Sequence, residues 1–165
     1  MLDTNYINLG FAGSCRGEET MANYLASLSA SVFVIDYDHN ASDPKELEER
    51  HYPLYKRIRD KNPKTPIVFI TRPNPERGGR NGANNVTYLN YEQNDRQKKT
   101  YNVIYDTYVR AKNEGDENVY FIDGRTLFGT ELRELCTVDG THPNDVGFYR
   151  MAKTIYPVLK EILEK

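Results

Sequence analysis

The sequence has no tryptophan, and it has only two cysteines and three histidines among its 165 residues. The two cysteines, Cys15 and Cys136, are too few for a disulfide framework and lack the spacing of metal ligands, so we expect reduced thiols and a cytoplasmic protein. No run approaches the roughly 20 apolar residues of a membrane span, and the start, MLDTNYINLG, lacks the basic and apolar regions of an export signal. We therefore expect a soluble chain with no membrane partner.

The sequence also lacks an excess of charge of either sign. It has 22 Lys+Arg and 24 Asp+Glu, which gives a formal net charge of −2. Binding to a nucleic-acid backbone needs clustered Lys and Arg to displace counterions, so a nucleic-acid partner is not expected. With 38% hydrophobic residues and 13 tyrosines, the core is expected to be modest and supplemented by tyrosine. The length predicts a single domain over residues 1–165.

Short β-rich runs alternate along the chain with longer segments of helical periodicity. Strands that alternate with helices pair in parallel through right-handed crossovers, so the pattern predicts an α/β fold, a three-layer α/β/α sandwich with a parallel, flavodoxin-like sheet. The runs that we interpret as strands buried on both faces are YINLG (6–10), SVFVIDY (31–37), PIVFIT (66–71) and NVYFID (118–123).

Four segments repeat apolar residues with the period of an amphipathic helix. Pro53 and Pro157 fall inside two of them, and because proline removes a backbone donor we expect a kink or an early helix end at each. A Gly/Asn/Arg-rich loop is expected over 74–85 and a short extended piece over 85–91. The predicted inward-facing residues are Met21, Tyr24, Leu25 and Leu28; Leu47, Leu54, Tyr55 and Ile58; Tyr101, Ile104, Tyr105, Tyr108 and Ala111, in a helix over about 95–113; and Phe148, Met151, Ala152, Ile155, Leu159 and Ile162, in a helix over 146–163.

A glycine-containing segment, GFAGSCRGEE, follows the first predicted strand. In an open parallel sheet, ligands bind beyond the carboxyl ends of the strands. Gly10 and Gly13 can adopt positive φ, and a helix expected from about Glu18 would direct backbone N–H groups at an anion. An ordinary strand-to-helix turn is the simpler interpretation. The segment is not a Walker loop, since no Gly-Lys-Ser/Thr follows.

The segment DYDHNAS follows the second predicted strand and brings polar side chains to the same edge. The side chain of Asn40 could aim two amide donors into a cleft there. Alternatively, Asn40 and Asp38 only shape a turn and cap the helix that begins near Pro44.

The strongest local signal is TVDGTHPND, directly before the last predicted helix. Asp139 and His142 stand three residues apart, so the carboxylate can accept a hydrogen bond from one imidazole nitrogen and leave the other free as a base. Pro143 keeps His142 out of the helix, because a residue before proline disfavours the helical conformation. A chance pairing without function is the alternative. Zinc is not expected, since no other His or Cys has ligand spacing with His142.

Taken together, NLGFAG, DYDHNA, a strand ending in TRP, and VDGTHPND, in this order, closely resemble the SGNH/GDSL hydrolase family of serine esterases. The resemblance runs from about Tyr6 to the C-terminus. It implies that Gly13, through its backbone N–H, and Asn40, through its side-chain amide, form the oxyanion hole. It also implies that Asp139 and His142 are the acid and base of a Ser-His-Asp triad, and that the reaction needs neither a cofactor nor a metal.

The sequence departs from that family at its first motif, the Gly-Asp-Ser-like or Gly-x-Ser-like turn that carries the nucleophilic serine. We expect that serine upstream of this chain, and we expect the strand before it to be missing from the centre of the sheet. Ser14, beside Gly13, and Cys15 are weaker substitutes for the nucleophile. Without the central strand, residues 6–10 would pair directly with residues 31–37, or a second copy would fill the gap and make a homo-oligomer.

The expected function is hydrolysis of a small-molecule ester, with a small, acetyl-like acyl group on a polar carrier such as a sugar. Arg72, at the end of the third predicted strand, and Arg16 could contact a polar substrate, although arginines on the surface are common. Two alternatives remain open at this point. A truncated or non-hydrolytic version of the fold would only bind ligand or assemble, and a flavodoxin-like flavin or phosphate binder would share the fold but leave Asp139 and His142 unexplained.

Overall fold

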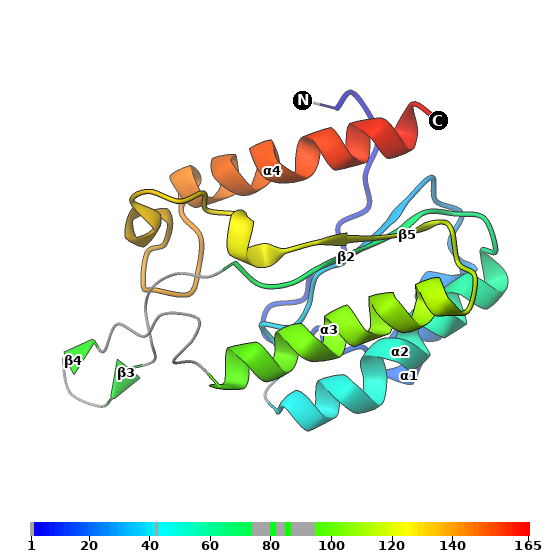
Figure 1. Cartoon of the computed structure of the whole chain (residues 1–165), viewed down its shortest axis with the longest axis horizontal. Helices are drawn as coiled ribbons and strands as arrows, with labels where there is room; N and C mark the ends of the chain where they lie inside the picture. The colour runs from blue at the N-terminus through cyan, green and yellow to red at the C-terminus, as the bar shows by residue number, and fades with distance from the viewer. Residues whose placement is uncertain (1, 42, 74–79, 82–84, 87–94) are drawn as a thin grey trace. The chain divides into compact units, whose positions relative to one another are not determined.

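The computed structural model of the chain describes residues 2–41, 43–73, 80–81, 85–86 and 95–165. Its contacts divide it into two compact units: Met1–Thr71 with Lys99–Ile122, and Arg72–Lys98 with Asp123–Lys165. Figure 1 labels the helices and strands of both. Two short strands, β3 (Arg80–Asn81) and β4 (Asn85–Val86), pair antiparallel. The rest of the loop expected over 74–85, and of the extended piece expected over 85–91, lies outside the described residues.

The sheet of the first unit contains β1 (Phe33–Ile35), β2 (Ile67–Ile70) and β5 (Val119–Ile122), in the order β1-β2-β5. Both pairs are parallel, with Phe69 of β2 opposite Ile35 on one side and opposite Phe121 on the other. The predicted parallel pairing of these segments is confirmed. β2, the central strand, is buried along its whole length, as a strand packed on both faces requires.

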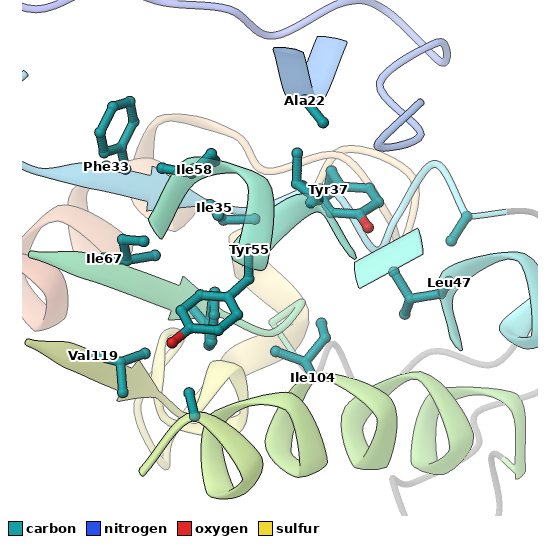
Figure 2. Packing of buried hydrophobic residues seen from close by; sticks show 14 residues of the cluster. Ala22, Phe33, Ile35, Tyr37, Leu47, Tyr55, Ile58, Ile67, Ile104 and Val119 are labelled. Atoms are coloured by element: carbon teal, nitrogen blue, oxygen red, sulfur yellow. The ribbon is translucent and has the colours of Figure 1, made fainter. Parts of the chain in front are cut away.

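Three helices contribute to the core of the first unit: α1 (Glu19–Ser27), α2 (Pro44–Lys61) and the part of α3 (Asp95–Asn113) from Lys99 onward. Their side chains meet alternate residues of the three strands on one face of the sheet (Figure 2). The α/β class is confirmed. The last helix, α4 (Asp145–Leu163), belongs to the second unit. The largest fully buried side chains of this core include Leu47, Ile58, Ile67, Phe69 and Ile104.

The prediction of a first strand over residues 6–10 is wrong. This segment has no strand structure, and Tyr6 and Ile7 are 86% and 66% exposed. The side chain of Asn8 accepts a hydrogen bond from the backbone N–H of Gly10 at 2.9 Å. Such a local turn competes with strand pairing, and it leaves this short run without a partner for its other backbone groups. Neither expected arrangement, direct pairing with residues 31–37 or a gap within the sheet, is formed by this chain.

Several predicted details of the other elements also need correction. Val34 of β1 is 45% exposed, so this strand is not buried on both faces. The helices α2 and α4 continue past Pro53 and Pro157, so neither proline ends its helix. All four residues predicted to face inward on α2 are buried, and His51 of this helix is buried as well. In the other helices, four residues predicted to face inward are exposed: Tyr24, Tyr105, Phe148 and Ala152.

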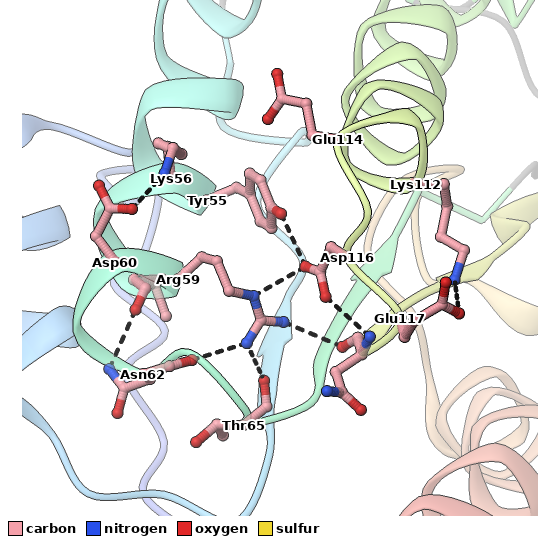
Figure 3. Close-up of polar contacts among 12 residues, drawn as sticks. Tyr55, Lys56, Arg59, Asp60, Asn62, Thr65, Lys112, Glu114, Asp116 and Glu117 are labelled. Carbon is pink, nitrogen blue, oxygen red and sulfur yellow. Dashed lines mark hydrogen bonds and ion pairs between the residues drawn. The ribbon is translucent and has the colours of Figure 1, made fainter.

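A buried arginine cross-links the segments that precede β2 and β5 in the first unit (Figure 3). The guanidinium of Arg59, on α2, donates to the carboxylate of Asp116 at 2.8 Å and to three backbone carbonyls. The side chains of Arg59 and Asp116 are only 11% and 8% exposed, and Asp116 also accepts from the hydroxyl of Tyr55 at 2.8 Å. We call this group the Arg59 clamp. The carbonyls belong to Asn62, Thr65 and Asn118.

The second unit contains α4 and two short 3-10 helices, η2 (Gly124–Thr126) and η3 (Arg133–Cys136). Arg150 of α4 donates to the carbonyls of Phe128 and Glu131 at 2.7 and 2.6 Å, which holds the segment before η3 against the helix. Among the helices described in both units, none combines the length and apolar character that crossing a bilayer requires.

Candidate active site

The loop between η3 and α4 is closed by a short antiparallel bridge between Thr137 and Pro143. The backbone N–H of Val138 donates to the carbonyl of His142 at 2.9 Å. Gly140 turns the chain with φ +86°, a region that favours glycine, and its N–H donates to the Thr137 hydroxyl at 3.1 Å. The loop is therefore fixed by its own backbone.

The loop is also anchored to the start of α4. The N-cap residue Asn144 accepts from the N–H of Gly147 at 3.1 Å, and its side-chain amide donates to the carbonyl of Leu135 at 2.8 Å. Its backbone N–H donates to the carbonyl of Cys136 at 3.0 Å. A Cβ atom on Gly147 would lie 2.1 Å from that same carbonyl oxygen, so only glycine permits this close approach.

Asp139 and His142 are in direct contact within this loop. The Asp139 carboxylate lies 2.7 Å from Nδ1 of His142 through Oδ2, and its Oδ1 accepts from the backbone N–H groups of His142 at 2.8 Å and of Thr141 at 2.9 Å. The backbone N–H of His142 first, and then its side chain, hold the pKa of Asp139 well below its usual range. The carboxylate therefore stays ionised and fixes the imidazole through Nδ1.

The other imidazole nitrogen of His142, Nε2, is open. The His142 side chain is 75% exposed, and within the described part of the chain its only side-chain partner is Asp139. An imidazole held by a carboxylate on one side and open on the other is the arrangement of a general base with its orienting acid. The expected contact between the two side chains is present. The expectation that both lie at the carboxyl edge of the sheet concerns both units and stays a prediction.

Gly13 and Asn40, the residues expected to form an oxyanion hole, both lie in turns of the first unit. Gly13 is exposed, with φ +67°, in a turn closed by a hydrogen bond from the N–H of Ser14 to the carbonyl of Phe11 at 2.9 Å. The N–H of Asn40 donates to the carbonyl of Tyr37 at 3.0 Å. No described residue is a hydrogen-bond partner of the Asn40 side-chain amide, and α2 is capped by Asp43 instead. The simpler interpretation of Asn40 as a helix cap is therefore wrong.

The other sequence-based candidates have ordinary surroundings. The Ser14 hydroxyl is exposed and donates to the carbonyl of Ala12 at 3.4 Å. Cys15 packs against the core, and burial raises the pKa of its thiol, which disfavours a reactive thiolate. Arg16 is exposed and Arg72 is half-buried. A further serine, Ser42, lies outside the described residues.

Three residues that support the site were not assigned from the sequence: Asn144, Gly147 and Arg150. Two of them carry a recognisable signal. An Asn directly before a helix is a preferred N-cap, and a glycine inside a helical pattern marks a close backbone approach. No group of three or more His, Cys, Asp or Glu side chains that could hold a metal ion occurs among the residues that the structure describes.

Comparison with known proteins gives one family and several related structures. The model of the GDSL-like lipase/acylhydrolase family matches residues 1–160. A protein from Bacteroides ovatus whose structure is described as that of a GDSL-like lipase is 32% identical, with a TM-score of 0.75 over 92% of this chain and 42% of that one. The comparison with curated proteins gives no match.

Two more distant structures share the fold. A salicylyl-acyltransferase from a tetracycline biosynthetic pathway is 19% identical, with a TM-score of 0.67 over 89% of this chain and 42% of that one. A family two carbohydrate esterase from Clostridium thermocellum, solved with cellohexaose, is 16% identical, with a TM-score of 0.59 over 85% of this chain and 38% of that one. This chain therefore spans less than half the length of each of the three proteins.

Proposed function

The chain belongs to the GDSL-like lipase/acylhydrolase family, and we propose that it supplies the acid and base of an esterase that hydrolyses small acyl esters without metal or cofactor. The observation that carries this proposal is the contact of 2.7 Å between Asp139 and Nδ1 of His142, with Nε2 open to solvent. The family supports ester hydrolysis in general, and the contact supplies the two groups that such a reaction needs for proton transfer.

In this mechanism His142 moves one proton twice. Its Nε2 takes the proton of a serine hydroxyl as the serine oxygen bonds to the ester carbonyl carbon, and then gives that proton to the alcohol oxygen as the ester C–O bond breaks. Asp139 stays ionised and stabilises the imidazolium between the two transfers. In the second half of the reaction the same nitrogen takes a proton from water as the water oxygen bonds to the acyl carbon, and it gives that proton to the serine oxygen as the acyl–serine bond breaks and the acid leaves. The sequence contains no Gly-Asp-Ser-like or Gly-x-Ser-like turn, so this mechanism does not assign its serine to a residue of this chain.

The oxyanion of this reaction would be held by the backbone N–H of Gly13 and the side-chain amide of Asn40. The positive φ of Gly13 and the unused amide of Asn40 support this assignment. Each such donor is typically worth about 10² to 10³ in rate. For the substrate we propose an acetyl-like ester of a polar carrier such as a sugar, in keeping with the carbohydrate esterase among the similar structures. Arg16 and Arg72 are proposed polar contacts to it.

The two cysteines of the chain are both free. Free thiols are typical of a reducing compartment, so we propose a cytoplasmic setting. The non-hydrolytic alternative remains, in which the chain binds an ester or assembles with another copy without cleaving a bond. The observation that favours it is that the sequence lacks the Gly-Asp-Ser-like or Gly-x-Ser-like turn of the family.

Hydrolysis of an activated acetyl ester by the chain, with mapping of any acylated residue, tests the proposal. We expect a low rate, because the base and acid are present without a described nucleophile. In the protein that carries the nucleophile, replacing His142 with Gln should lower turnover by about 10² or more, whereas the matched variant His39→Gln should have a smaller effect. Equal turnover for His142→Gln and the parent of that protein would contradict the proposal. An acyl label on Ser14, lost together with turnover in Ser14→Ala, would instead place the nucleophile within the chain.

The oxyanion assignment has its own test in the protein that carries the nucleophile. Asn40→Ala should lower turnover by about 10² or more without weakening the Asp139–His142 contact. That contact can be followed by the NMR signals of the imidazole. An unchanged turnover would remove Asn40 from the proposed oxyanion hole.

A further inference from the structure

Val138 is the cross-strand neighbour of His142. The bridge between Thr137 and Pro143, with the hydrogen bond from the Val138 N–H to the His142 carbonyl, places Val138 and His142 directly opposite each other in the next pair of the ladder. Side chains of opposite residues in an antiparallel pair project from the same face, with Cβ atoms about 4.5–5.5 Å apart. This register places the valine side chain on the same face of the ladder as the imidazole.

The two faces of this short ladder differ in exposure. Thr137, on one face, is 8% exposed, whereas Val138, on the face of His142, is 73% exposed. A valine with this exposure contributes little to the packing of the loop. The surrounding segment has the same character, since large apolar side chains that are between 47% and 73% exposed are frequent in it. These are Leu132, Leu135, Val138, Val146, Phe148 and Tyr149.

The chemistry of the proposed function decides which part of a substrate meets this surface. The nitrogen Nε2 must give its proton to the leaving alcohol, so the alcohol oxygen must come within about 2.6–3.2 Å of it. The carbon atoms bonded to that oxygen then lie over the residues next to the imidazole.

We propose that Val138 is a specificity-determining residue, an apolar wall beside His142 that takes the carbon skeleton of the leaving alcohol. This inference rests on the proposed function and deepens it. The favoured substrates are esters whose alcohol presents an apolar face at the ester oxygen, such as an aryl or alkyl carbon or the C–H face of a sugar ring. An alcohol that is charged or strongly hydrated at this position is disfavoured. Removing the Val138 side chain should lower the preference for such esters over esters of hydrated alcohols by about ten-fold. Losing contact with a methylene group in an apolar pocket has an effect of this size.

Alkylation of His142 tests the wall without any need for the nucleophile. Phenacyl bromide and bromoacetamide both react by attack of the imidazole Nε2 lone pair on a CH₂ carbon with loss of bromide, and they differ in the apolar ring that follows. Rates at His142 are measured by site-resolved mass spectrometry on the whole chain, and the ratio of the two rates is compared with that for N-acetylhistidine. We expect the ratio at His142 to be about ten-fold higher. The buried His51 should not react.

Variants separate the wall from the rest of the site. Val138→Ser and Val138→Ala should lower the ratio at His142 toward that of N-acetylhistidine, and Val34→Ser, which changes an exposed valine of β1, should leave it unchanged. Asp139→Asn should lower both rates together and keep the ratio. A ratio equal to that of N-acetylhistidine in the parent chain, or one unaffected by Val138→Ser, overturns the wall. An Asp139→Asn variant that changes neither rate counts against the proposed function and leaves the wall standing.

Discussion

Asp116 and Asp139 are each held by several hydrogen bonds, but the two sites use them differently. In the Arg59 clamp the partner is an arginine whose donors reach Asp116 and three carbonyls, and both side chains are almost wholly buried. In the loop before α4 the partner is a histidine with one nitrogen on the carboxylate and the other open, on a side chain that is 75% exposed.

The difference shows how a fold separates stability from chemistry. A buried charge must have its hydrogen-bonding capacity filled by the protein, because any donor left over costs free energy. A catalytic group must keep part of its hydrogen-bonding capacity for the substrate. It can do so only where water makes those hydrogen bonds while no substrate is bound. We therefore expect changes at the Arg59 clamp to affect folding and changes at Asp139 to affect reactivity.

The largest expected effect is on the free energy of unfolding, and it arises at the Arg59 clamp. Arg59→Leu would leave Asp116 as an uncompensated buried carboxylate and remove the donor to three carbonyls. We expect the free energy of unfolding to fall by about 3–5 kcal/mol, measured by urea denaturation. The control Arg57→Leu removes an exposed arginine of the same helix, paired with Glu19 at 3.6 Å, and should change little. Equal losses in the two variants would break the comparison.

His51 provides the buried counterpart to His142. Burial lowers the pKa of His51 from 6.5 to about 3. Between these values the unfolded chain binds a proton at this residue and the folded chain does not, so falling pH favours unfolding by about 1.4 kcal/mol per pH unit. The free energy of unfolding, measured by urea denaturation from pH 7 to pH 4, should therefore depend less steeply on pH in His51→Phe than in the parent protein.

The close approach of α4 to the loop gives a third, smaller effect. Alanine favours a helix over glycine by about 1 kcal/mol, but the added Cβ of Gly147→Ala would lie 2.1 Å from the Cys136 carbonyl oxygen. We expect a net loss of about 1–3 kcal/mol in the free energy of unfolding and altered NMR signals of the His142 imidazole. Lys153→Ala, on an exposed position of the same helix, is the control. A gain in stability for Gly147→Ala would show that the contact is not constraining.

The smallest effect concerns the titration of Asp139 itself. Its pKa is lowered by hydrogen bonds from His142, so the loop gains stability above the ordinary aspartate value of about 4 and loses it as pH falls through the lower folded value. The ¹³C signal of the Asp139 carboxyl should therefore titrate below that of exposed aspartates. In His142→Gly the midpoint should move upward while the backbone hydrogen bonds keep part of the shift. An Asp139 midpoint near 4 in the parent protein would contradict this account.

The parts of the molecule with strong periodicity could be predicted from the sequence. The runs predicted over residues 66–71 and 118–123 have an apolar or aromatic centre and contain the neighbouring strands β2 and β5, and the helix expected over about 95–113 is α3. The contact between Asp139 and His142 also followed from spacing alone, because both residues lie in one short loop where local geometry decides. The run over residues 6–10 failed because strand formation depends on a partner, which no local pattern supplies.

Other features depended on information that a single segment does not carry. The close contact of Gly147 with Cys136, and the reach of Arg150 to residues 128 and 131, appear only once the chain has turned back on itself. The burial of Tyr105, which is 41% exposed, was overestimated because helical periodicity predicts the face on which a residue lies and not how much of that face other elements cover. The contacts of Gly147 and Arg150 depend on how distant segments approach each other, which the periodicity of one segment does not predict.

The contact between Gly147 and Cys136 also ties the acid and the base to one helix. α4, its N-cap and the loop from Cys136 to Asn144 are joined by backbone contacts. We therefore expect a change that shifts the start of α4 to displace Asp139 and His142 together and to keep the contact between them.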